Sequence, residues 1–148
     1  MATEFRLILE GDIPLRHVAD IAAPEAREVV EPGYRPRLSA DLYEQLGYAI
    51  TIVSGNNGYY DAESGNSDLW VWEPESYAKI TFYIGAGDIG DLGVPNMFAA
   101  VARVLEARPE DAALIQNSNW LLLTRVNGTI RNHNLDLWYD DALNLIPG

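Results

Sequence analysis

Hydrophobic and polar positions along the chain switch between two periodicities, and each switch marks an expected element. Residues 5–9 are apolar except for Arg6 and are followed by Gly11 and Asp12, which predicts a strand and a turn. Over residues 13–22 the apolar positions lie three and four apart, so a helix is expected. Residues 23–38 mix prolines with charges, which predicts a loop with room for one short extended piece.

The middle of the chain is dominated by a period of two. Before it, Ser39 is a candidate cap for a short helix over residues 40–46, which Gly47 would end. Four strand candidates then follow, over residues 48–54, 59–64, 69–73 and 77–84. Residues 55–58 read Gly-Asn-Asn-Gly, a typical hairpin turn because Asn and Gly accept positive φ. Since short connections join strands of opposite direction, the four segments are expected to form an antiparallel meander.

The last third of the chain predicts one long helix and further hairpins. A glycine-rich loop is expected over residues 85–93 and a helix over residues 95–108. The helix is predicted from an apolar stripe formed by Met97, Phe98, Val101, Val104 and Leu105. Three strands joined by Asn-containing turns are expected afterwards, over residues 112–116, 120–126 and 129–132. Residues 135–146 fit a short helix or an edge strand.

Together these elements predict a single α+β domain over residues 1–148. The length suits one domain, and the apolar fraction of 48% is ordinary for a protein with a packed core. We expect a mainly antiparallel, twisted sheet, made of the meander and the hairpins, with one long and one or two short helices packed on one face. Trp120 and one of Trp70 and Trp72 are expected in the core.

The charge of the chain narrows the range of partners. Net charge is −12, and Lys79 is the only lysine. Such a chain repels phosphate backbones and anionic lipids, so we expect neither a nucleic-acid nor a membrane partner. The acidity suits either solubility or complementarity to a basic protein, and both interpretations stay open. Since the sequence shows neither a leader pattern nor a run of the ~20 apolar residues that spans a bilayer, we expect a cytoplasmic protein.

Cysteine and histidine, which often act as nucleophiles, bases or metal ligands, are scarce in this sequence. With no cysteine, the chain has no thiol nucleophile, disulfide or thiolate metal site. The two histidines, His17 and His133, are far apart in the sequence, and no H-E-x-x-H or G-x-S-x-G motif occurs. We therefore expect no metal, no cofactor and no enzymatic activity.

One motif, at residues 85–90, matches the dinucleotide fingerprint G-x-G-x-x-G. In that fingerprint the glycines open a helix whose amides hold the pyrophosphate. Here the helix is expected to begin only at Val94 or Pro95, and Asp88 and Asp91 would place negative charge beside the phosphates. We therefore expect no nucleotide binding at this motif.

Carboxylates and aromatic side chains gather over residues 59–77. Alternation along the predicted strand puts Asp61 and Glu63 on one face and Ala62 on the other, which is typical of a solvated or partner-binding face. Two carboxylates among aromatic rings also suit a glycosidase, so a small carbohydrate-active hydrolase stays open as an alternative.

A partner-binding surface in this segment would combine acidic side chains, which steer a basic partner, with aromatic anchors. The sequence does not determine which alternate side chains of residues 69–73 point inward. The candidate residues are Tyr59, Asp61, Glu63, Trp72, Glu73 and Glu75.

A family resemblance rests on several short stretches spread along the chain. They read LSADLY (38–43), GNNGYY (55–60), LWVWEPESY (69–77), PEDAAL (109–114), LLLTR (121–125) and LIPG (145–148). In these stretches the chain resembles the third type of Sit immunity proteins, partners of swarming-inhibition toxins in bacterial toxin–immunity systems. The resemblance implies a cytoplasmic protein that neutralises a cognate toxin by tight, non-catalytic binding, and it supplies no catalytic residues. A structural or regulatory domain without a toxin partner is the third possibility.

Overall fold

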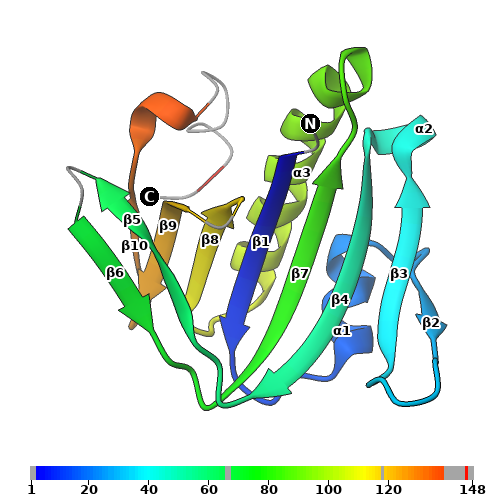
Figure 1. Ribbon diagram of the computed structural model, residues 1–148, viewed down its shortest axis with the longest axis horizontal. Coiled ribbons are helices and arrows are strands. Elements are labelled where there is room, and N and C mark those ends of the chain that lie inside the picture. The colour runs from blue at the N-terminus through cyan, green and yellow to red at the C-terminus, as the bar shows by residue number, and fades with distance from the viewer. Residues whose placement is uncertain (1–2, 66–67, 118, 139–145, 147–148) are drawn as a thin grey trace.

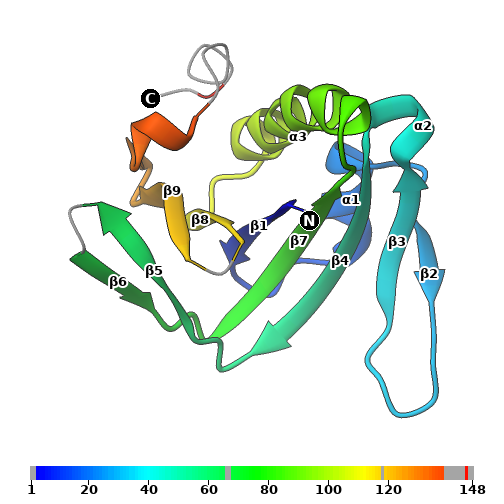
Figure 2. The ribbon, with the colours of Figure 1, turned by 45° about the horizontal axis from the view of Figure 1, so that its top comes forward.

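The computed structural model describes residues 3–65, 68–117, 119–138 and 146. Their elements are β1 (Thr3–Glu10), α1 (Leu15–Ala22), β2 (Arg27–Val29), β3 (Arg37–Leu42), α2 (Tyr43–Leu46), β4 (Tyr48–Asn56), β5 (Tyr60–Gly65), β6 (Asp68–Trp72), β7 (Ser76–Ile84), α3 (Asp88–Ala107), β8 (Ala112–Gln116), β9 (Trp120–Val126), β10 (Thr129–Asn132) and a 3-10 helix (Leu135–Leu137). The strands form one mainly antiparallel sheet, with α1 and α3 on one face (Figures 1 and 2). The predicted α+β class is confirmed.

The centre of the sheet has the strand order β4-β7-β1-β8. β7 and β8 both pair antiparallel with β1, so they run parallel to each other with β1 between them, and α3 connects them. β1 and β4 likewise flank β7, and α1 lies in the chain between them. Two interleaved units of this kind make a split β-α-β arrangement, which leaves one helical face and one open face.

The helical face carries the main core. Leu7 and Phe82 from the sheet and Met97, Val101 and Val104 from α3 are fully buried there. The predicted apolar stripe of the long helix is thus confirmed, since Leu105 is buried as well. Burial of these side chains against the sheet is what holds α3 in place.

The long helix begins at Asp88, so the predicted loop over residues 85–93 is wrong. Glycine is a poor helix former, but here the absence of side chains serves close packing. A Cβ on Gly93 would collide with the carbonyl oxygen of Gly47, and a Cβ on Gly90 would collide with that of Gly85. These close backbone contacts need glycine and outweigh the helix penalty of ~1 kcal/mol per glycine. Pro95, expected near the start, lies inside the helix.

The predicted helix over residues 40–46 is shorter in the structure. Residues 40–42 complete β3, and only Tyr43–Leu46 are helical. Ser39 pairs with Thr51 of β4 instead of capping a helix, because burial of Leu38 and Leu42 favours the strand. Gly47, with φ of 84°, ends α2 as expected. The short extended piece expected within residues 23–38 is β2, which pairs with β3.

The predicted meander is wrong in its pairing, because β4 and β5 are not neighbours. β4 pairs with β7 along its whole length. The ladder then continues past the Gly-Asn-Asn-Gly segment, where Asn57 and Gly58 donate backbone hydrogen bonds to the carbonyls of Glu75 and Pro74. Beyond this point β5 pairs with β6. Residues 48–84 therefore form one long, bent hairpin, and the glycines at the expected turn leave room for the ring of Tyr77.

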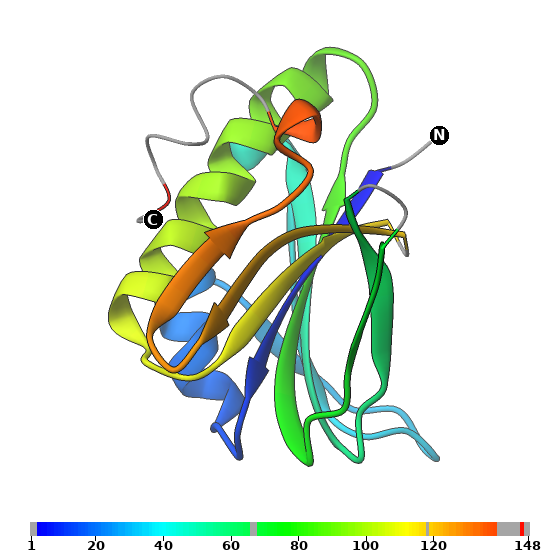
Figure 3. The ribbon, with the colours of Figure 1, turned by 90° about the vertical axis from the view of Figure 1, so that its left-hand side faces the viewer.

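The far end of this hairpin, β5–β6, folds over the open face of the sheet. Figure 3 shows it on the side of the sheet opposite α3. β5 reaches β9 through a parallel pairing of Glu63 with Trp120. A second, smaller core lies beneath it, formed by Ile8, Tyr60, Ala62, Ala113, Ile115 and Leu121, with Trp70, Trp72 and Tyr77 partly buried against it.

The tail begins with the 3-10 helix, and residues 139–145, where the rest of the expected helix or edge strand falls, lie outside the described residues. Trp138 is buried in the main core, and its ring centroid lies 5.3 Å from that of Phe98. Trp120, which we expected in the core, is only half-buried, like Trp70 and Trp72.

Candidate partner-binding site

The outward face of the β5–β6 hairpin carries most of the predicted partner residues. Along β5, Tyr60 and Ala62 are buried, whereas Asp61 is exposed and Glu63 is half-buried on the other side. The predicted alternation of this strand is thus confirmed. Glu73 and Glu75 are exposed at the bend that follows β6, and the side chain of Tyr59 is 59% exposed.

Two aliphatic side chains complete this face, and sequence reasoning missed them. Val71 pairs with Asp61 and Leu69 pairs with Glu63, so all four belong to one face of the hairpin. Leu69 is 69% exposed and Val71 46%. In Leu69-Trp70-Val71-Trp72, the side chains that point to either face of the strand are apolar. The sequence therefore did not determine which of the two pairs points inward. We call the set Tyr59, Asp61, Glu63, Leu69, Val71 and Glu73 the hairpin face.

Trp72 does not belong to the hairpin face. It is half-buried and points toward the second core, where its ring centroid lies 6.3 Å from that of Tyr60 and 5.9 Å from that of Trp70. The guanidinium of Arg6, on β1, lies over the ring of Tyr60, with 5.8 Å between the Arg6 Cζ and the ring centroid. These inward aromatic contacts hold the hairpin on the sheet.

The carboxylates considered for a hydrolase lie at a shallow depression on the surface. Asp61 and Glu63 line it together with Leu69, Asn119 and Trp120, and its volume is about 230 Å³. Glu73 and Glu75 are not among its lining residues. The structure thus brings two of the acidic side chains together beside one tryptophan and leaves the other two at the bend.

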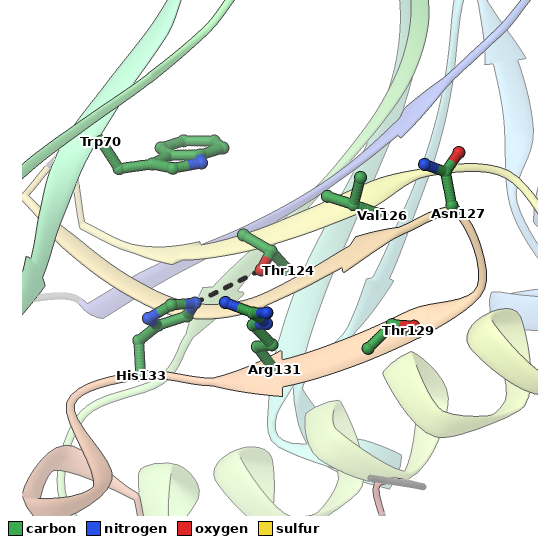
Figure 4. A pocket seen from close by; sticks show the side chains of 7 residues that line it. All are labelled: Trp70, Thr124, Val126, Asn127, Thr129, Arg131 and His133. Carbon is green, nitrogen blue, oxygen red and sulfur yellow. Dashed lines mark hydrogen bonds between the residues drawn. The ribbon is translucent and has the colours of Figure 1, made fainter.

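A larger groove separates the β5–β6 hairpin from the β9–β10 hairpin. Its volume is about 540 Å³, within the range of ligand pockets. Figure 4 shows Trp70 on one side and, across from it, side chains of β9, β10 and the residues next to them. The lining residues are Trp70, Thr124, Val126, Asn127, Thr129, Arg131 and His133. No part of this groove was foreseen from the sequence, because its walls come from segments about fifty residues apart.

A comparison with models of protein families shows the family to which the chain belongs. The family model described as SitI3-like matches residues 3–142, nearly the whole chain. The chain belongs to the SitI3-like family. The resemblance to Sit immunity proteins is thereby confirmed, and membership implies a toxin as partner. No curated protein and no solved structure matches the chain.

One polar interaction lies buried under the SitI3-like sheet. The Arg125 guanidinium, on β9, donates hydrogen bonds to the carbonyl oxygens of Leu105, Arg108 and Glu110, at 2.6, 2.6 and 2.9 Å. Burial lowers the pKa of Arg125, although the nearby Glu110 carboxylate partly offsets this effect. Because Arg125 satisfies the carbonyls at the end of α3, it is a structural residue that ties the long helix to β9.

His133 of the SitI3-like protein is held in the wall of the groove. Its Nε2 lies 3.3 Å from Thr124 Oγ1. Burial lowers the pKa of His133, and the charge of Arg131 lowers it further, whereas a hydrogen bond with the backbone of Ser64 acts in the opposite direction. The imidazole is therefore neutral at pH 7, which makes it a poor partner for an anion by itself.

The structure bears on the metal and nucleotide sites that we did not expect in the SitI3-like protein. Among them, no three His, Cys, Asp or Glu side chains lie close enough to hold a metal ion. The expectation that the helix begins only at Val94 or Pro95 is wrong, because α3 begins at Asp88, directly after Gly87. This part of the reasoning against nucleotide binding therefore fails. Asp88 and Asp91 do occupy the first turn of α3, where their negative charge would lie beside the phosphates. The absence of nucleotide binding stays a prediction for this reason. No helix in the described part of the chain is long and apolar enough to cross a membrane.

Proposed function

We propose that this SitI3-like protein is an immunity protein, which neutralises a cognate toxin in the cytoplasm by binding it directly and without catalysis. Membership of the family over residues 3–142 is the observation that carries this proposal. The acidic charge agrees with it, because a protein that must capture one partner quickly gains from complementary charge.

The hairpin face is the proposed docking surface for a basic patch of the toxin. It combines the exposed aliphatic side chains Leu69 and Val71 with the carboxylates of Asp61, Glu63 and Glu73. Apolar side chains supply the desolvated centre that tight binding needs, and the surrounding charges set encounter rate and selectivity. Tyr59 extends the apolar part at one end, and Glu75 adds charge at the bend.

Co-expression with the candidate toxin, taken from the gene next to that of this chain, tests the function. We expect the wild-type protein to restore growth and to form a complex with the purified toxin. The double variant Asp61→Lys and Glu63→Lys should slow association at low salt and weaken its salt dependence, because two attractive charges become repulsive.

A matched control carries the same charge change elsewhere on the surface. Glu44 on α2 and Glu106 on α3 are exposed and lie outside the hairpin face, so Glu44→Lys with Glu106→Lys should leave association nearly unchanged. Equal slowing by both pairs would show that only net charge matters and that the hairpin face is not the docking surface. Failure of the wild-type protein to bind or protect would refute the immunity function itself.

A further inference from the structure

The groove between the two hairpins lies on the face of the sheet that the helices leave open. Thr124 and Val126 alternate along β9, and their partners on β10 are Arg131 and Thr129. These four side chains share one face of the β9–β10 hairpin, with His133 following them. Trp70 of β6 forms the opposite wall, so the groove is open in the middle and bounded by two hairpins (Figure 4).

The charge of the groove is opposite to that of the protein. Among its described lining residues Arg131 is the only one with a full charge at neutral pH, since His133 is neutral. Arg131 is exposed, and its guanidinium forms no hydrogen bond or ion pair with another described residue. In a chain of net charge −12, an unpaired guanidinium in a concave site is available to an anion.

The opposite wall is aromatic and well supported. Trp70 is half-buried, and its ring packs at 5.9 Å from the ring of Trp72, which belongs to the second core. A supported indole ring facing a groove offers a flat apolar surface for another aromatic or aliphatic side chain. Thr124, Thr129 and Asn127 add hydroxyl and amide groups along the floor.

We propose that the groove receives a loop of the toxin, with an acidic side chain paired to Arg131 and a neighbouring apolar side chain packed on Trp70. This inference rests on the proposed function and adds a second, oppositely charged contact to it. β6 connects the two surfaces, because Leu69 and Val71 point to the hairpin face while Trp70 points into the groove. A toxin seated on the hairpin face therefore reaches the groove around the free edge of β6.

Blocked dipeptides test the chemistry of the groove without the toxin. N-acetyl-Asp-Phe-amide is titrated into ¹⁵N-labelled protein while the indole N–H signal of Trp70 is followed, assigned with the Trp70→Phe variant. We expect weak, saturable binding that is about five-fold tighter than for the isosteric N-acetyl-Asn-Phe-amide, as an exposed charge pair contributes modestly. N-acetyl-Asn-Phe with a free carboxyl terminus is the further control. It has a terminal carboxylate but no acidic side chain, so it shows which kind of carboxylate the groove prefers.

The variant Arg131→Glu gives the decisive comparison. It should abolish the preference for the Asp peptide, whereas Arg27→Glu, at the exposed strand β2, should retain it. Equal affinity for the Asp and Asn peptides, or no saturable shift of Trp70 with either, would overturn the proposal. A preference for the free carboxyl terminus alone would also overturn the assignment to an acidic side chain.

The same variants separate this inference from the proposed function. We expect Arg131→Glu to weaken the complex with the toxin at least ten-fold, mainly through faster dissociation, with Arg27→Glu as the unchanged control. If Arg131→Glu leaves the complex unchanged while the wild-type protein binds and protects, the groove proposal fails and the immunity function stands. If the wild-type protein does not bind the toxin, both fail.

Discussion

The two faces of the central sheet are covered in different ways. On the helical face, side chains such as Leu7, Phe82 and Met97 are fully buried in a continuous core. On the other face, the β5–β6 hairpin covers a small core with aromatic side chains that stay half-buried, among them Trp70 and Trp72. The helical face thus has a continuous core that can secure the fold, whereas the other face carries a hairpin that packs on a small core and keeps its outward side and Trp70 accessible.

The largest effect is expected where the helical core is damaged. Phe82 is fully buried, and its ring packs edge-on at 5.2 Å from Tyr48. Phe82→Ala should lower the free energy of unfolding by ~3–5 kcal/mol, because it removes apolar contacts and leaves a cavity. Urea denaturation followed by circular dichroism measures this loss. A loss below ~1 kcal/mol would contradict the view that this face secures the fold.

A smaller loss is expected from the polar link between the helix and β9. Arg125→Met keeps most of the side-chain volume but leaves the carbonyls of Leu105, Arg108 and Glu110 without their donor. We expect a loss of ~2–4 kcal/mol, since buried acceptors without partners are costly. Thermal unfolding gives the measurement, and Arg103→Met, which removes longer hydrogen bonds to Ile21 and Ala22, is the control with a smaller effect.

Damage to the hairpin core is expected to stay local. Trp72→Ala removes contacts of a half-buried ring, so we expect a loss of ~1–3 kcal/mol and not the full cost of a buried tryptophan. Hydrogen exchange should speed up in β5 and β6 while β1, β7 and α3 stay protected. Uniformly faster exchange across all strands would show that the two faces unfold as one unit and would break the comparison.

The smallest effect is a pH dependence at the groove. Burial lowers the pKa of His133 below its ordinary value of 6.5, so the unfolded chain takes up the proton first as pH falls. Stability should therefore decrease from about pH 6.5 downward until the folded pKa is passed. His133→Gln should remove this slope. An unchanged slope in the variant, measured by thermal unfolding between pH 5 and pH 7, would contradict the assignment.

Glu110, next to the main core, titrates in a different range. Its burial raises the pKa, but hydrogen bonds from Arg108 and its own backbone amide, with the charge of Arg125, outweigh burial and lower it below 4.5. Its contribution to stability is therefore present above about pH 4.5 and is lost as pH falls through the folded pKa. A loss that begins near pH 6.5 and disappears in His133→Gln belongs to the groove, whereas one that begins near pH 4.5 and disappears in Glu110→Gln belongs to the end of α3.

Local patterns in the sequence determined the fold class, the apolar stripe of α3, the β8–β9 hairpin and the alternation of Asp61 and Glu63. Each depends on periodicity within one segment, which the residues themselves specify. Tertiary structure decided the pairing of β4 with β7, the start of α3 at Asp88, the inward turn of Trp70 and Trp72, and the groove around Arg131. These features depend on which distant surfaces meet: Gly93 accommodates Gly47, and Trp70 faces β9 and β10 only because the long hairpin bends. Such contacts join residues far apart in the chain, so no local period encodes them.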